Sequence, residues 1–277
     1  MLRRVLVPLN FHEKPEKLDA MCEFLTRLGT RKLVLLHVGP NTRSHGRHNR
    51  ARIAEIADQV RELGFETDTV VRPGSRQMVI VQTAAEVEAD YIAFAFQKKS
   101  ILRRTIMGST VKDVIRQSDI PILVYKQPPL LWGSDEKFRA MYATSLQWGD
   151  DIILSYIRDK RFEADEIVFL HVGSRAPDPF VERERRDRVE RQLWELRRNC
   201  GLGESDSEHL AVIGTARRQI IKAARRIQVS LVLIGKADKT IGFAPVLGST
   251  AEEVSYNVGC SVLIIPRDIE SSEEAGR

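Results

Sequence analysis

The sequence predicts two tandem α/β domains, each a doubly wound, five-stranded parallel sheet with helices on both faces. Three observations support this prediction. The chain has 277 residues, which is enough for two domains of about 140 residues each. Several stretches of the first half return in the second half. Continuous apolar runs alternate with amphipathic segments, a pattern typical of a parallel sheet that is covered on both faces.

An internal repeat sets the domain organisation. The stretch "VLLHVGP" at 34–40 returns as "VFLHVGS" at 168–174, an offset of 134 (168 − 34). The stretch 70–95 returns at 210–235, an offset of 140 (210 − 70). Six residues (140 − 134) are therefore inserted in the polar region after the "LHV" strand, where an insertion disturbs the fold little. We expect a first domain at 1–126, a linker rich in proline and charge at 127–138, a second domain at 139–268 and a flexible tail at 269–277.

The elements of the first copy follow from hydrophobic periodicity. Strands are expected where β-branched apolar runs occur, at 4–9, 32–38, 65–72, 90–96 and 121–126. Helices are expected where apolar residues recur at three- and four-residue spacing, at 16–28, 52–63, 77–88 and 109–118. In such sheets, ligands bind at the carboxyl ends of the strands where the strand order reverses.

Composition limits the class of protein. Hydrophobic residues make up 43% and charged residues 29%, as in ordinary globular domains. The net charge of +5 comes from 43 bases and 38 acids, so nucleic acid is not an expected partner. No apolar run reaches the roughly 18 residues of a membrane span, and we expect a cytoplasmic protein without a membrane partner. The three widely spaced cysteines are expected to be buried free thiols.

Four histidines and one charge-dense stretch are expected to have structural and not functional roles. His45 and His48 have metal-compatible spacing but no evident third ligand, so we expect a polar loop and no metal site. His37 and His171 recur at strand ends and are expected to pack or form hydrogen bonds. The charge-dense stretch 182–199 is expected to be an exposed helix with ion pairs, its narrow apolar face formed by Val189, Leu193 and Leu196.

Both copies place Gly-Ser-Thr before a helical pattern, at 108–110 and 248–250. Glycine lets the backbone approach a ligand closely, and Ser109 and Ser249 are good N-cap residues. Thr110 and Thr250 add a hydroxyl in the first turn, where free N–H groups and the helix dipole favour phosphate. The alternative for each site is a capped helix without a ligand.

In the second copy, Gly235 lies thirteen residues before Gly248 (248 − 235). The stretch "VLIGKADKTIGFAPVLGSTAEEV" resembles the phosphate loop of the universal stress protein family, which has a glycine, two residues, a second glycine, nine residues and then Gly-Ser or Gly-Thr. Asp238 replaces the middle glycine. The order of strands, "LHV" motif and glycine loop extends the resemblance over both copies. The chain therefore resembles a tandem universal stress protein, with the fold called adenine nucleotide alpha hydrolase-like.

The resemblance implies an adenine nucleotide, ATP or AMP, between the strand tips, and we expect it in the second domain. Val172 and Ile234 would then lie near the adenine or ribose, and Ser145 takes the position of the family's acidic residue. Gly235, Gly248, Ser249 and Thr250 would surround the phosphates. Asp238 would repel phosphate unless it turned outward or held Mg²⁺.

The first domain departs further from the family pattern. The corresponding site residues are Asn10, Val38, Lys98, Gly108, Ser109 and Thr110. Ala95 and Lys98 stand at the first two glycine positions. Two alternatives remain: a solvated basic loop that no longer binds, which we favour, or cationic side chains that replace the lost backbone contacts to phosphate.

The resemblance favours a stress-response regulatory protein with no assigned catalytic residue. One alternative is a nucleotide-independent interaction protein with relic pockets, and another is a slow ATPase or phosphotransferase that relies on Asp238. We expect an internal pseudo-dimer or a homodimer of tandem chains, with the closing strands at 122–124 and 262–265 at the contact. The sequence does not identify a protein partner.

Overall fold

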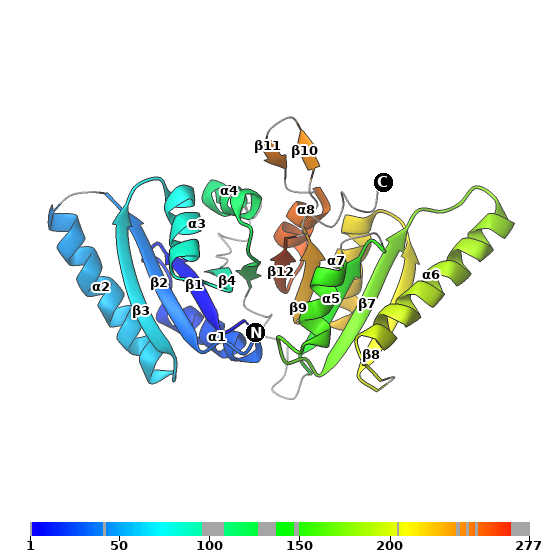
Figure 1. Ribbon diagram of the computed structural model, residues 1–277, viewed down its shortest axis with the longest axis horizontal. Coiled ribbons are helices and arrows are strands. Elements are labelled where there is room, and N and C mark those ends of the chain that lie inside the picture. Colours follow the sequence, from blue (N-terminus) through cyan, green and yellow to red (C-terminus); the bar gives the residue numbers. More distant parts are fainter. Residues whose placement is uncertain are drawn as a thin grey trace. The chain divides into compact units, whose positions relative to one another are not determined.

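The computed structural model describes residues 2–40, 43–95, 108–126, 137–146, 150–203, 205–236, 239–241, 244–246 and 249–266. Two compact units make up the chain, Met1–Gln127 and Pro128–Arg277, and each is described by itself (Figure 1).

Unit 1 contains a parallel sheet with the strand order β3-β2-β1-β4-β5. The strands are β1 (Arg4–Leu9), β2 (Lys32–Gly39), β3 (Glu66–Pro73), β4 (Tyr91–Ala95) and β5 (Ile122–Tyr125). The chain runs outward from β1 to β3 and then crosses back to β4 on the other side of β1. Right-handed crossovers in opposite directions place the connecting helices on opposite faces of the sheet. The fold is therefore doubly wound, as predicted.

Four helices connect these strands: α1 (Pro15–Arg27), α2 (Arg43–Glu62), α3 (Arg76–Glu86) and α4 (Ser109–Gln117). Helix α2 packs on β2 and β3, whereas α3 packs against α4. Figure 1 shows α2 and α3 on opposite sides of the strands.

Unit 2 repeats this topology, with the strand order β8-β7-β6-β9-β12. Its sheet contains β6 (Arg139–Thr144), β7 (Glu166–Gly173), β8 (Ser207–Ile213), β9 (Leu231–Gly235) and β12 (Ser261–Ile265). Its helices are α5 (Asp151–Arg158), α6 (Pro179–Asn199), α7 (Ala216–Ile227) and α8 (Ser249–Asn257). A small antiparallel hairpin, β10 (Lys239–Ile241) and β11 (Ala244–Val246), lies between β9 and α8 in the chain.

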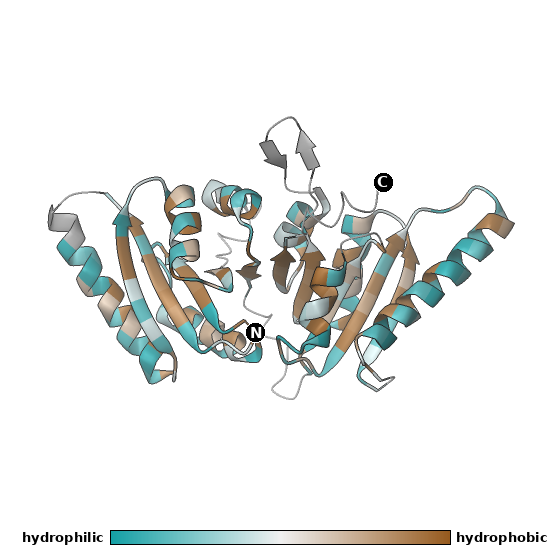
Figure 2. Ribbon diagram, viewed as in Figure 1, coloured by the Kyte–Doolittle hydropathy of each residue, from teal (hydrophilic) through white to brown (hydrophobic). Residues whose placement is uncertain are grey.

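The central strands carry the cores, because both of their faces are covered by helices. Figure 2 shows hydrophobic residues along the strands and hydrophilic residues on the outer sides of the helices. In β1, Val5 and Leu6 are fully buried, and in β9 so are Leu231 and Val232. All three cysteines are free and buried, as predicted. No helix within the described ranges is both long and apolar enough to cross a membrane.

Most expected elements are confirmed to within a residue or two, but the prediction around His45 and His48 is wrong. Helix α2 begins at Arg43, so both residues lie in a helix and not in a loop. No proline interrupts the polar stretch, and the buried Ile53, Ala57 and Val60 anchor the later turns, so the helix extends toward its N-terminus.

Helix α6 matches its prediction as an exposed, ion-paired helix. Val189 and Leu193 are buried, while most of its charged side chains are exposed. Arg185 pairs with Glu182, and Glu190 contacts His209. The charge density of this helix is therefore compatible with packing along one narrow apolar face.

Candidate functional site

A cavity of about 470 Å³ lies in unit 1 at the carboxyl ends of β1, β2 and β4. The strand order reverses between β1 and β4, and the cavity is located at this switch point. Its wall is formed by Pro8, Leu9, Asn10, His12, Glu13, Leu36, His37, Val38, Arg76, Ile80, Phe94, Ala95, Gly108, Thr110, Val111 and Val124. The wall combines an apolar floor with a few polar groups, as is typical of small-molecule sites.

The turn after β1 forms one side of the cavity. The Asn10 side-chain Oδ1 accepts a hydrogen bond from the His12 backbone N–H at 2.8 Å. The Asn10 backbone N–H in turn donates to Glu13 Oε1 at 3.1 Å. These bonds close a tight polar turn. Within it, Phe11 has a φ of +64°, an uncommon conformation for a bulky residue.

A stack of side chains supports this turn. The rings of Phe11 and His37 stack with centroids 3.9 Å apart and planes 15° from parallel. The Arg52 guanidinium lies 5.2 Å from the Phe11 ring centroid and donates a hydrogen bond to the Phe11 carbonyl at 2.5 Å. The strained residue is therefore held by a ring, a cation and a hydrogen bond.

His37 connects the stack to β1. Its Nδ1 lies 3.0 Å from the Leu9 carbonyl oxygen, and because a carbonyl only accepts, Nδ1 carries the proton. Burial lowers the pKa of His37 below its ordinary value, and Arg76 and Arg52 act in the same direction, against the hydrogen bond and Glu13. The ring is thus neutral at pH 7 and keeps Nε2 as an acceptor. The predicted hydrogen-bonding role of His37 is confirmed.

The N-terminus of α4 also lines the cavity, through Gly108, Thr110 and Val111. Gly108 is the N-cap residue, with φ −56° and ψ 147°, and no side chain caps this end among the described residues. Ser109 begins the helix one position after the cap, so the expectation that its side chain caps the helix is wrong. A Cβ added to Gly108 would meet nothing within 4 Å among the described residues. Val111 N–H donates to the Gly108 carbonyl at 3.1 Å, so among the described residues the N–H groups of Ser109 and Thr110 are the ones left for a ligand.

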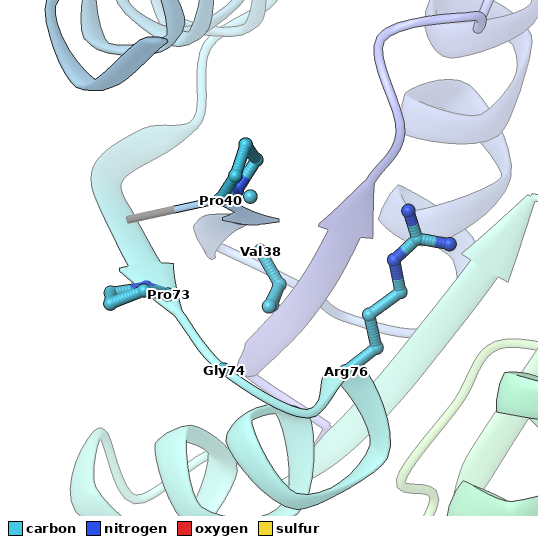
Figure 3. A pocket seen from close by; sticks show the side chains of 6 residues that line it. Val38, Pro40, Pro73, Gly74 and Arg76 are labelled. Atoms are coloured by element: carbon cyan, nitrogen blue, oxygen red, sulfur yellow. The ribbon is translucent and has the colours of Figure 1, made fainter. Parts of the chain in front are cut away.

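Arg76 supplies a positive charge at the cavity. Gly74, with φ +131°, turns the chain from β3 into α3 and places Arg76 in the first turn of that helix. Among the described residues, its exposed guanidinium has neither an ion-pair nor a hydrogen-bond partner. Arg76 and Val38 also line a second hollow of about 480 Å³. Figure 3 shows Pro40 and Pro73 on one side of this second hollow, with Arg76 extending away from them.

The corresponding strand ends of unit 2 carry more internal contacts. Thr144 donates its hydroxyl to the buried Asp150, and His171 Nδ1 lies 3.1 Å from the Thr144 carbonyl oxygen. Burial lowers the pKa of His171, as in unit 1. At the end of β7, a Cβ on Gly173 would clash with Arg185 Nη1, so the Arg185 guanidinium covers this glycine.

Glu182 neutralises that guanidinium. Arg185 Nη2 donates to Glu182 Oε1 at 2.7 Å, and Ala176 N–H donates to Oε2 at 2.8 Å. The bond to Arg185 is the largest cause of a Glu182 pKa that is lowered to about 2. This cation is thus already paired within the protein, whereas Arg76 has no such partner in the described ranges.

The structure brings together most of the residues predicted for the first domain. Asn10, Val38, Gly108 and Thr110 line one cavity, and Ser109 lies in the same helix turn. Lys98 lies outside the described residues.

In the second domain, the described site residues follow strand ends or begin α8. Val172 lies near the end of β7, Ile234 and Gly235 end β9, Ser145 follows β6, and Ser249 and Thr250 begin α8. Asp238 and Gly248 lie outside the described residues.

Sequence reasoning missed Glu13 and Arg76 as cavity residues. Glu13 lies three positions after the family's acidic position, and Arg76 lies before the helix pattern that began at Gln77. The polar spacing from Asn10 to Glu13, just before the Pro15 that starts α1, was the available signal. No group of three or more His, Cys, Asp or Glu side chains in the described part of the chain is arranged to hold a metal ion.

These features define a tandem pair of doubly wound α/β domains, and in unit 1 a cavity lies at the point where the strand order reverses. The model of the universal stress protein family matches residues 1–126 and 149–266. The chain belongs to the universal stress protein family, with the family domain present in tandem.

Individual relatives agree with this assignment. The universal stress protein Sll1654 of Synechocystis sp. is 25% identical over 134 residues, which span 45% of this chain and 85% of that protein. A putative universal stress protein of Pseudomonas aeruginosa has a TM-score of 0.72 at 16% identity and covers 99% of this chain and 97% of its own. One from Archaeoglobus fulgidus has a TM-score of 0.70 at 17% identity and covers 98% of each chain. The structural matches show the shared fold.

Proposed function

We propose that this chain is a stress-response regulatory protein that binds an adenine nucleotide, ATP or AMP, in the cavity of unit 1. The observation that carries this proposal is the meeting of Asn10, Val38, Gly108 and Thr110 around one cavity at the switch point. These are the first-domain positions to which the family resemblance assigns the nucleotide.

The two sides of the cavity suit different parts of a nucleotide. Within the described part of the chain, the first turn of α4 has no side-chain cap and Arg76 has no ion-pair partner, and both favour an anion. A phosphate group has the charge and acceptor oxygens to use both. The apolar floor, which includes Val38, Ile80 and Phe94, suits a planar base. A volume of about 470 Å³ lies in the usual range for ligands of this size.

The geometry shifts our preference from the second domain to the first. In unit 2 the described strand ends carry Arg185 over Gly173 and the paired Thr144 and Asp150. In unit 1 the corresponding edge combines a cavity with Arg76, which has no ion-pair partner among the residues that the structure describes. Binding in the second domain stays a prediction, because Asp238 and Gly248 lie outside the described residues.

Regulation would follow from binding only if two conformations of the protein differ in their affinity for the nucleotide. The proposed regulatory role therefore requires a state that nucleotide stabilises. An enzymatic role would require an acid or base beside the phosphates.

Calorimetric titration of the whole chain with AMP and with ATP tests this proposal. We expect a stoichiometry of one nucleotide per chain, lost when the unit 1 cavity is altered by Arg76→Glu. The matched control is Ala216→Glu, because Ala216 occupies the place of Arg76 in the second repeat (76 + 140). Heat that survives Arg76→Glu and disappears with Ala216→Glu would locate the site in unit 2. Absence of heat and of any melting shift at millimolar nucleotide would support the interaction protein instead.

A further inference from the structure

The cavity of unit 1 contains a carboxylate whose bonding is incomplete. Glu13 Oε1 accepts the Asn10 backbone N–H, but Glu13 Oε2 is buried and has no hydrogen-bond partner among the described residues. A buried acceptor without a partner is unfavourable, and for a carboxylate oxygen the cost is higher than for a neutral group. Because Glu13 also lines the cavity, a rotation of its carboxylate would let a donor on a ligand satisfy this oxygen.

The neighbouring polar groups do not supply that donor. The acceptor oxygen of Asn10 is engaged by the His12 N–H. His37 uses its protonated Nδ1 for the Leu9 carbonyl, which leaves only the acceptor nitrogen Nε2. Arg52 donates to the Phe11 carbonyl. The turn after β1 is therefore rich in acceptors on the side where Glu13 lines the cavity.

We infer that Glu13 accepts hydrogen bonds from the ribose hydroxyls of the nucleotide and makes this site selective for ribonucleotides over dideoxyribonucleotides. This inference rests on the proposed function. A vicinal diol offers two O–H donors, which matches a carboxylate that lacks a donor. The terminal torsion of a Glu side chain is soft, so the carboxylate can rotate to present an oxygen to the cavity, and Oε1 can accept a second hydrogen bond beside that of the Asn10 N–H.

The position of Glu13 also accounts for the uncharged Asn10. Asn10 follows β1, where the family resemblance expects an acidic residue, but here its side chain closes the turn. That turn brings Glu13 back to the same cavity three residues later. Compared with the family pattern, the carboxylate is therefore supplied by Glu13 instead of position 10, and it still lines the same cavity.

The acceptor and the anion-binding groups come from different elements of the unit. Gly108 and Thr110 at the start of α4 and Arg76 at the start of α3 attract phosphate. Glu13 comes from the β1–α1 turn. A ligand with hydroxyl donors at one end and an anion at the other fits this division, and a nucleoside monophosphate has that chemistry.

Titration of the full chain with AMP and with 2′,3′-dideoxy-AMP tests the inference. The variant Glu13→Gln keeps the oxygen that accepts the Asn10 N–H and replaces Oε2 by a nitrogen that cannot accept. We expect AMP affinity to fall about tenfold to a hundredfold, and dideoxy-AMP affinity to change little, because only AMP has the hydroxyl donors. The control Glu16→Gln removes an exposed carboxylate in the first turn of α1 and should leave both affinities unchanged.

The melting temperature of each variant is measured alongside, so that loss of binding is separated from loss of folding. Glu13→Asp provides a second variant that keeps the charge and shortens the reach, and we expect an AMP affinity between those of Glu13→Gln and the unmodified chain. Equal losses for AMP and dideoxy-AMP, or no loss, would overturn the role of Glu13 and leave the proposed function intact. No AMP binding by the unmodified chain would overturn both.

Discussion

Replacing Gly108 by Asp should weaken nucleotide binding while leaving the fold as stable as before, or slightly more stable. Gly108 is the N-cap residue of α4, has a φ of −56° that any residue can adopt, and has open space where a Cβ would lie. Aspartate is a better N-cap residue than glycine by a few tenths of a kcal/mol and also favours the helix dipole. The melting temperature should therefore rise by about 1 °C or stay unchanged.

The effect on binding has the opposite sign. A carboxylate at position 108 would occupy the amides that phosphate needs and place a negative charge beside it. Two unit charges about 4 Å apart repel by roughly 4 kcal/mol at an effective dielectric constant of about 20. Since Gly108 is exposed, we take about half of this value. That corresponds to an affinity about 30-fold lower than without the charge.

Gly108→Asn isolates the charge, because Asn has nearly the same shape and caps helices equally well. Calorimetry with AMP and thermal melting of both variants provide the comparison. We expect both variants to melt alike, and the Asp variant to bind AMP about tenfold to a hundredfold more weakly than the Asn variant. Equal affinities of the two variants would refute the placement of phosphate at the start of α4.

Three further predictions concern other residues. Arg76→Gln should weaken AMP binding about tenfold by calorimetry and leave adenosine binding nearly unchanged, because a single charge-assisted contact to phosphate is lost; equal losses would contradict an anion-binding role. Tyr91→Phe should lower the unfolding free energy of unit 1 by about 1 kcal/mol in urea titrations, because the buried hydrogen bond between Tyr91 and Thr30 is removed; an unchanged midpoint would show that this bond contributes nothing. Burial lowers the pKa of His37 in the folded protein, so the unfolded chain binds a proton at this residue more readily than the folded protein does. The stabilisation that comes from neutral His37 is therefore complete above about pH 6.5 and is lost as the pH falls below that value. The decline of unfolding free energy between about pH 7.5 and 5.5 should be smaller in His37→Asn, and an identical decline would assign the effect to other groups.

The sequence predicts the fold well because strands buried on both faces must be apolar, and this requirement produces both the apolar runs and their repetition in the second half. Strand β1 was expected at 4–9 and is found at Arg4–Leu9, since a buried parallel strand reads as a continuous apolar run. Helix α2 was shortened in the prediction, because its first turns have no apolar stripe and depend on later turns for stability. The β10–β11 hairpin was missed because its two strands have only three residues each.

The site was only partly predictable. Family spacing led to Asn10, Val38, Gly108 and Thr110, which do meet. Glu13 reaches the cavity through a turn that depends on a left-handed Phe11, and left-handed conformations of bulky residues leave no periodic signal.

The choice between the two domains rests on two different signals. The better preserved glycine loop favours the second domain, and that expectation stays a prediction. Helical spacing predicts the ion pair between Glu182 and Arg185, but not that Arg185 lies over Gly173 at the end of β7.

A crystal structure of the full chain with AMP tests the central claim most directly. We predict that the phosphate lies against the first turn of α4 at Gly108 and Thr110, with the ribose beside Glu13. AMP found only at the strand ends of unit 2, or a unit 1 cavity that stays empty at saturating AMP, would contradict the account.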